Sequence, residues 1–161
     1  MIFAASANKG INHEAIMKNK TVFIVDSDSC SAQKLRVHLE ALHFDVKYFT
    51  TGSEMMNHLP SNPSLIILAQ DLAENNTGLD YLRLIKTINR NIPVLFLLAQ
   101  NNLSMAVHAL RLGAAFYLEK LNTSFESIKS VLYDLDIEKK RKYWSALRNF
   151  RQGVFNLYGI Y

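Results

Sequence analysis

Acidic, amide and basic side chains stand at the ends of several hydrophobic runs in the sequence. They follow the runs at 21–25, 65–69 and 115–118, and they are Asp26, Ser27, Asp28, Gln70, Asp71 and Lys120. The carboxylates of Asp26 and Asp28 are hard oxygen ligands of the kind that Mg²⁺ prefers, so they could form a weak divalent site. The same residues are good caps for a following helix, a role that needs no metal, and we favour this interpretation. We expect Lys120 to form an ion pair with Asp26 where the strand ends meet.

The hydrophobic runs alternate with segments of helical periodicity. Short apolar runs predict strands at 21–25, 45–49, 65–69, 94–98 and 115–118. Apolar residues at helical spacing predict helices at about 29–43, 52–59, 79–88, 102–112 and from 123 onward. This alternation predicts one α/β domain in three layers, with a five-stranded parallel sheet covered by helices on both faces. The functional crevice of such a sheet lies beyond the carboxyl ends of its strands, which is where the polar residues stand.

Composition excludes several classes of protein. A chain of 161 residues with 49% hydrophobic residues fits a single domain with a buried core. One cysteine, Cys30, excludes a disulfide framework, and the five histidines show no metal-binding spacing. The apolar runs are far shorter than the roughly 20 residues that span a bilayer, and the first residues do not resemble a secretory signal. We therefore expect a soluble, cytoplasmic protein.

The basic excess of the chain is confined to its last part. The formal net charge is +4, yet residues 138–151 hold six basic residues and one acidic residue. The rest of the chain has twelve basic and thirteen acidic residues and is nearly neutral. Any affinity for a polyanion is therefore expected in this segment.

The charge and hydropathy patterns divide the chain into three parts. We predict an N-terminal extension at 1–20, a domain at 21–136 and a basic, aromatic-rich helical tail at 137–161. Apolar residues of the tail recur near helical spacing, and those proposed for interaction are Tyr143, Trp144, Leu147 and Phe150. This helix is expected to pack on its own domain or on a second copy. Binding to nucleic acid or a membrane surface, and a link to a further output domain, stay open as alternatives.

Five segments of the chain resemble the response-regulator receiver domain of two-component signalling. The similar segments occur in family order and at family spacing, at 22–28 (VFIVDSD), 63–68 (PSLIIL), 78–82 (GLDYL), 93–94 (PV) and 113–120 (GAAFYLEK). The resemblance covers about residues 21–136 and implies a flavodoxin-like (βα)5 fold with a C-terminal helical extension. It also implies a pocket in which an aspartate at the end of the third strand accepts a phosphoryl group with the help of Mg²⁺.

Several pocket positions of the family carry other residues in this chain. The phosphoacceptor position falls on Ala69 when counted from Pro63 and on Gln70 when counted back from Gly78, and neither residue can form an acyl phosphate. The second acidic position of the first strand is Ser27, and the hydroxyl position after the fourth strand is Leu98.

Other family positions are retained or only partly changed. The family lysine is present as Lys120, but Leu121 replaces the proline that usually follows it. Tyr117 matches the switch aromatic, and we expect it to keep one rotamer because Leu98 offers no hydroxyl.

These departures favour a phosphorylation-independent signalling module that is not an enzyme and acts through a protein partner or through dimerisation. We expect no cofactor and no metal, with residual Mg²⁺ binding unfavoured. Two alternatives stay open: Asp71 could serve as a displaced phosphoacceptor, and the tail could bind nucleic acid or a membrane surface.

Overall fold

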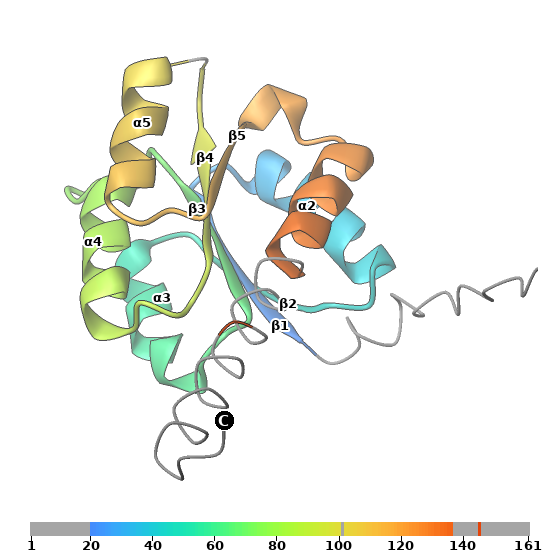
Figure 1. Ribbon diagram of the computed structural model, residues 1–161, viewed down its shortest axis with the longest axis horizontal. Coiled ribbons are helices and arrows are strands. Elements are labelled where there is room, and N and C mark those ends of the chain that lie inside the picture. Colours follow the sequence, from blue (N-terminus) through green and yellow to red (C-terminus); the bar gives the residue numbers. More distant parts are fainter. Residues whose placement is uncertain (1–19, 101, 137–144, 146–161) are drawn as a thin grey trace, which may run out of the picture.

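The computed structural model describes residues 20–100, 102–136 and 145, and a parallel five-stranded sheet forms its centre (Figure 1). The sheet has the order β2-β1-β3-β4-β5. Its strands are β1 (Thr21–Val25), β2 (Asp45–Phe49), β3 (Leu65–Ala69), β4 (Val94–Leu98) and β5 (Phe116–Glu119). Every neighbouring pair is parallel, as the alternation of strands and helices predicts.

Helices cover both faces of the sheet, which gives the three predicted layers (Figure 1). The labelled helices are α2 (Ser29–Ala41), α3 (Gly52–His58), α4 (Gly78–Ile88) and α5 (Leu103–Arg111), and a further helix occupies residues 125–136. Two short 3-10 turns, η1 (Leu59–Ser61) and η2 (Lys120–Asn122), follow α3 and β5. None of the helices in the described part of the chain is long and apolar enough to cross a membrane.

Successive residues of the strands enter two separate cores. Phe23 and Val25 of β1 pack beneath α3, α4 and α5, whereas Val22 and Ile24 pack beneath α2 and the helix at 125–136. This division follows from the two-residue period of a strand, whose side chains point alternately to opposite faces. The strands β3 and β4 are buried along their whole length, because both of their faces are covered.

Polar side chains fix where the helices begin. The Asp28 carboxylate accepts hydrogen bonds from the backbone N–H groups of Cys30 and Ser31 and caps α2. Thr77 and Asp80 form a reciprocal capping box at the start of α4. The preference for Asp28 as a helix cap is thus confirmed.

Element boundaries differ from the sequence predictions by only a few residues. The strand predicted at 115–118 lies at Phe116–Glu119, where Glu119 pairs with Leu98. The helix α3 ends at His58, and Pro60 lies inside the 3-10 turn η1. Proline lacks the N–H that would continue an α-helix, so the chain changes to the tighter turn here.

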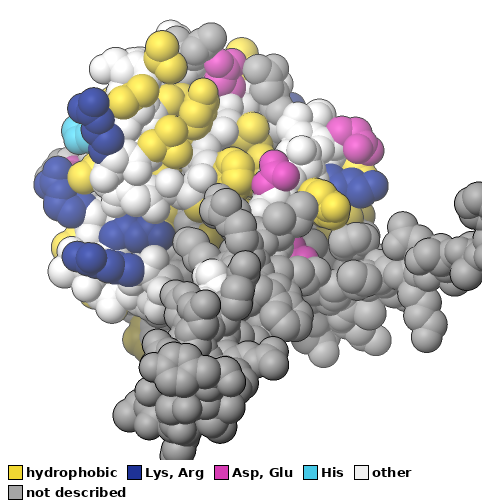
Figure 2. All heavy atoms as spheres, in the orientation of Figure 1, with side chains coloured by type: hydrophobic (Ala, Val, Ile, Leu, Met, Phe, Trp, Pro, Cys, Tyr) yellow, Lys and Arg dark blue, Asp and Glu magenta, His cyan; other side chains and the backbone are white. Residues whose placement is uncertain are grey.

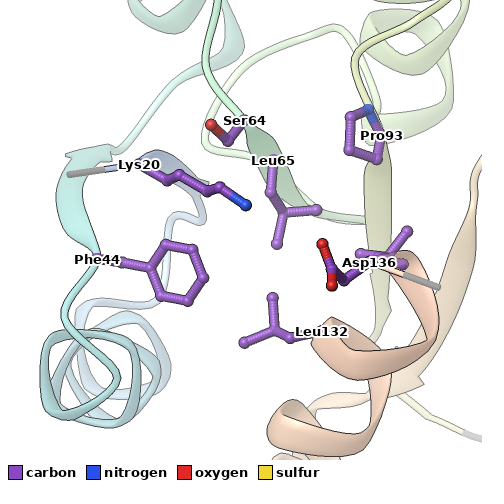
Figure 3. A pocket seen from close by; sticks show the side chains of 8 residues that line it. Lys20, Phe44, Ser64, Leu65, Pro93, Leu132 and Asp136 are labelled. Carbon is purple, nitrogen blue, oxygen red and sulfur yellow. The ribbon is translucent and has the colours of Figure 1, made fainter. Parts of the chain in front are cut away.

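The amino-terminal edge of the sheet carries a small hollow of about 30 Å³ (Figure 3). The Lys20 and Asp136 side chains both line it, together with apolar residues such as Phe44 and Leu132. The described body of the chain therefore begins and ends at the same edge of the sheet. Of the predicted extension at 1–20 and tail at 137–161, only Lys20 and Ser145 are described, so these boundaries stay predictions.

Candidate functional site

The carboxyl edge of the sheet brings together residues that end or follow four different strands. Asp26 follows β1, Gln70 follows β3, Leu98 ends β4, and Lys120 comes directly after β5. Parallel strands place all their carboxyl ends at one edge, so residues far apart in the sequence meet there.

An ion pair between Lys120 and Asp26 forms the centre of this edge. Lys120 Nζ lies 2.7 Å from Asp26 Oδ1, across 94 positions of sequence. The Asp26 side chain is completely buried, and the Lys120 side chain is 17% exposed. The backbone N–H of Asp28 also donates to Asp26 Oδ1, at 2.9 Å. The predicted pairing of Lys120 with Asp26 is therefore present, and it gives a buried carboxylate the cation that it requires.

The second carboxylate oxygen of Asp26 has no partner. Asp26 Oδ2 is buried and forms no hydrogen bond with any described residue. A buried charged oxygen without a donor costs free energy, so the ion pair compensates only half of this carboxylate. The carboxyl edge of the sheet therefore contains one buried oxygen atom whose hydrogen-bonding capacity is unused.

Tyr48 supports Asp26 from the neighbouring strand. The Tyr48 hydroxyl donates to the backbone carbonyl oxygen of Asp26 at 2.8 Å. Burial raises the pKa of Tyr48, and the negative charges of Asp26 and Asp28 raise it further. The phenol therefore stays protonated and keeps its role as a donor over the whole neutral range.

Gln70 is the residue at which the chain leaves β3. Ala69 ends the strand and is completely buried. The Gln70 N–H donates to Leu97 at 2.9 Å, and its carbonyl accepts from the Gly78 N–H at 2.9 Å. The loop that follows thus leaves the sheet at Gln70 and returns to the Gln70 carbonyl at Gly78. The phosphoacceptor position remains predicted at either Ala69, which is buried, or Gln70, which is half-buried.

The remaining predicted residues of the edge differ in exposure. Leu98 is 1% exposed and belongs to the core beneath α4 and α5. Asp71 is exposed, and its backbone carbonyl accepts a hydrogen bond from the Ser27 hydroxyl at 3.3 Å. Tyr117 is 41% exposed on β5. The proposed interaction residues of the tail lie outside the described residues, and they are Tyr143, Trp144, Leu147 and Phe150.

Glu74 forms a network that the sequence analysis did not predict. Its carboxylate accepts from the Ser53 hydroxyl at 2.7 Å, from the Tyr81 hydroxyl at 2.9 Å and from the Gly52 backbone N–H. Burial raises the pKa of Glu74, but the hydrogen bonds from Ser53, Tyr81 and Gly52 together outweigh it and lower the pKa overall. The network ties the loop after β3 to the start of α3. Glu74 is one acid in a polar loop, and nothing in its sequence neighbourhood identifies partners 21 residues away.

Comparison with known protein families agrees with this geometry. The model of the response regulator receiver domain matches residues 22–132, which is more than half of the chain. The chain belongs to this family. Receiver domains are modules of two-component signalling that act through partner proteins. The predicted family and the flavodoxin-like fold are therefore confirmed.

Curated relatives are identical to this receiver domain at about a quarter of the aligned positions. Nodulation protein W of Bradyrhizobium diazoefficiens is 25% identical over 131 residues, which cover 81% of this chain and 57% of that protein. The response regulator protein GraR of Staphylococcus aureus is 28% identical over 127 residues, which cover 74% of this chain and 56% of that protein. The chain thus spans a little over half the length of these relatives.

Solved structures share the fold of this receiver domain. The signal receiver domain of a LuxO repressor protein from Vibrio parahaemolyticus aligns with a TM-score of 0.69 at 24% identity, covering 78% of this chain and 96% of that one. NtrX from Brucella abortus aligns with a TM-score of 0.72 at 22% identity, covering 79% of this chain and 29% of that one.

The residues at the carboxyl edge do not fit the Mg²⁺ ion that the family implies. Asp26 Oδ1 is already bound to Lys120, and the Asp28 carboxylate caps α2. Across the described residues, no three His, Cys, Asp or Glu side chains converge as a metal site. Mg²⁺ requires several hard oxygen ligands in near-octahedral geometry, whereas Asp26 Oδ2 is a single oxygen atom.

Proposed function

We propose that this receiver domain acts as a phosphorylation-independent signalling module that is not an enzyme and works through protein contacts. The observation that carries the proposal is Gln70 at the point where the chain leaves β3. An acyl phosphate forms on a carboxylate oxygen, and the neutral amide of Gln70 offers no such nucleophile.

The ion pair at the edge supports the same proposal. Lys120 contacts the Asp26 carboxylate directly, so the positive charge of Lys120 is already compensated. Leu98 contributes an apolar side chain where a phosphoryl oxygen would need a hydrogen-bond donor. The edge thus has the composition of a structural contact between strands.

Chemical phosphorylation tests the proposal. The intact chain is incubated with acetyl phosphate and Mg²⁺, and its mass is measured; in parallel, beryllofluoride with Mg²⁺ is added while amide resonances are recorded. We expect no mass increase and no resonance shifts at the carboxyl edge. A stable aspartyl phosphate on any residue would overturn the proposal.

Asp71 is the alternative acceptor, because it is exposed and adjacent to Gln70. If the wild-type chain is labelled, Asp71→Asn decides the site: loss of the label would assign the acceptor to Asp71. Labelling that persists in Asp71→Asn would exclude this alternative. The control is Asp45→Asn, an exposed carboxylate at the opposite edge of the sheet, which should leave any labelling unchanged.

An apolar stripe along α5 is the surface that we propose for protein contacts. Leu103, Val107 and Leu110 are 69%, 39% and 42% exposed and follow one another at helical spacing. Leu103 and Val107 border a hollow of about 610 Å³ beside α5. Figure 2 shows hydrophobic side chains gathered over this part of the molecule. Exposed apolar residues in a continuous patch mark a contact surface more often than single ones do.

Substitution on the stripe tests this surface. Leu103→Glu with Leu110→Glu is compared with wild type by analytical ultracentrifugation. We expect a dimer in the wild type and a monomer in the double variant, while Val37→Glu, at an exposed apolar site on α2, leaves the dimer intact. A dimer that persists in the double variant would exclude α5 as its interface.

A further inference from the structure

A hollow of about 460 Å³ between α4 and the turn after α5 is lined by an unusual concentration of cations. Its charged lining residues are Arg83, Lys86, Arg90 and Arg111, and Leu112 provides apolar lining. No acidic residue lines it. Lys and Arg side chains gather over α4 and the end of α5 in the space-filling view (Figure 2).

The fold brings these cations together from two elements. Arg83 and Lys86 are three residues apart and lie on one side of α4, and Arg90 follows just beyond the end of the helix. Arg111 ends α5. The turn between α5 and β5 passes close to α4 at Gly113, whose φ of +102° suits glycine; a Cβ there would lie 3.3 Å from Lys86 Cγ.

Among the described residues, Arg83 is the one arginine of the hollow with a carboxylate nearby: its charge helps to lower the pKa of Asp80, after the larger effect of the hydrogen bonds from Thr77. The ion pairs Arg36–Glu40 and Lys120–Asp26 of the described residues do not involve Arg83, Arg90 or Arg111. The whole segment from residue 81 to residue 118 contains no aspartate or glutamate. Lys86 Nζ donates to the Ile92 carbonyl at 2.5 Å, which holds its charge at the wall of the hollow.

Helix dipoles explain only part of this cluster. Lys86 lies in the last turn of α4 and Arg111 in the last turn of α5, where a cation stabilises the helix end. Arg83 lies in the middle of α4, beyond the reach of that effect. Asp80, at the start of the same helix, offsets the charge of Arg83 only in part, so the excess of cations that line the hollow favours an anionic ligand.

We propose that this hollow binds a small soluble ligand that carries two or more phosphate groups. A single phosphate carries a charge of about −1.5 to −2 at neutral pH, so one phosphate does not balance the three arginines. Guanidinium groups bind phosphate through paired hydrogen bonds. The hollow lies in the usual size range of small-molecule sites, about 300–1,000 Å³. A nucleic acid duplex would instead require cations spread along an extended surface, since its charges recur about every 1.7 Å.

Titration calorimetry with inorganic tripolyphosphate tests the proposal on the intact chain at fixed ionic strength. The test variant is Arg83→Gln with Arg111→Gln. The matched control is Lys34→Gln with Lys47→Gln, which removes the same charge from exposed positions on α2 and β2. We expect the dissociation constant to rise about tenfold or more in the test variant and to change less than about twofold in the control. Equal weakening in both variants, or a wild-type dissociation constant above about 1 mM, would overturn the proposal.

The basic residues at 139–142 require a separate experiment, because they too attract polyanions. The variant for this experiment has Gln in place of Lys139, Lys140, Arg141 and Lys142. If the variant with Gln at 139–142 still binds tripolyphosphate, the result supports binding in the hollow. If this variant loses binding while Arg83→Gln/Arg111→Gln retains it, the proposal is overturned. A short DNA duplex and phosphatidylserine vesicles are tested alongside. Binding of either one that depends on Arg83 and Arg111, without tripolyphosphate binding, would also overturn it.

Discussion

At the scale of single residues, the pair of Asp26 and Lys120 determines how the carboxyl edge is held together. Asp26 is completely buried, and Lys120 is the cation in contact with it. A carboxylate removed from water is stable only with a partner, so the lysine acts as a structural counter-ion between β1 and the end of β5.

Removal of the lysine charge should be costly. Lys120→Met leaves the Asp26 carboxylate buried without a counter-charge, and we expect the free energy of unfolding to fall by about 3 kcal/mol in urea denaturation. The double variant Asp26→Asn/Lys120→Met should recover much of this loss, because it no longer buries a charge. Arg36→Met, which breaks an exposed pair with Glu40, is the control and should cost under about 0.5 kcal/mol. A loss as small as the control's would contradict the structural role of the pair.

His43 occupies a backbone conformation that favours glycine. Its φ is +65°, in the turn between α2 and β2. We expect His43→Gly to raise the free energy of unfolding by up to about 1 kcal/mol, because a side chain in the left-handed region costs roughly 1–2 kcal/mol and glycine returns part of this in entropy. Gln33→Gly, at an exposed site inside α2, is the control and should lower stability. A destabilised His43→Gly variant would show that the imidazole forms a compensating contact.

At the scale of elements, the loop between β3 and α4 is held at both of its ends. Gly78 donates its N–H to the Gln70 carbonyl, and Glu74 accepts three hydrogen bonds from α3 and α4. Each end of the loop therefore has a contact whose contribution to stability can be measured by substitution.

Close backbone contact makes Gly78 necessary at the start of α4. A Cβ at this position would lie 2.1 Å from the Ala69 carbonyl oxygen, and neither backbone can move without disturbing β3. We expect Gly78→Ala to lower the free energy of unfolding by about 2–3 kcal/mol in urea. Ser104→Ala, in the exposed first turn of α5, should change it by less than about 0.5 kcal/mol. A neutral Gly78→Ala would mean that the loop relaxes freely.

Glu74 should make the stability of the domain depend on pH. Its pKa is lowered from the ordinary value of 4.5, so the unfolded chain binds the proton more readily than the folded one. The contribution of Glu74 is therefore complete above about pH 4.5 and disappears as the pH falls through the lowered value. Urea midpoints of wild type and Glu74→Gln should differ at neutral pH and converge in acid. A difference that is constant over this range would contradict the role of the charge.

At the scale of the whole domain, the central strands of the sheet are the ones most protected from solvent. The strands β3 and β4 are buried throughout, whereas β2 and β5 lie at the edges and are partly exposed. We expect amide hydrogen exchange in β3 and β4 to require global unfolding, and exchange in β5 to be faster by local opening. Mass-spectrometric exchange on the intact chain measures both, and equal protection of β5 and β3 would contradict this order.

The fold was predictable because apolar periodicity is a local property of the chain. Each strand from 21–25 to 94–98 occurs where its hydrophobic run stands. The pairing of Asp26 with Lys120 was also predictable, because parallel strands bring their carboxyl ends to one edge. The Glu74 network was not, since its partners depend on the path of a loop. The basic hollow was not predicted, because the charges of the body nearly cancel in sum. Its sequence signal is the segment at 81–118, which has no acidic residue, and the packing of α4 against the turn after α5 brings the cations of this segment together.

The position of Lys20 and Asp136 has a consequence for any longer polypeptide that contains this body. Both residues line the same small hollow from opposite sides, so the chain enters and leaves the domain at the same edge of the sheet. A tension applied between residues 20 and 136 would act across that hollow (Figure 3) and would not run along the strands. A circular permutant that joins the two residues by a linker long enough to cross the hollow should therefore keep the fold.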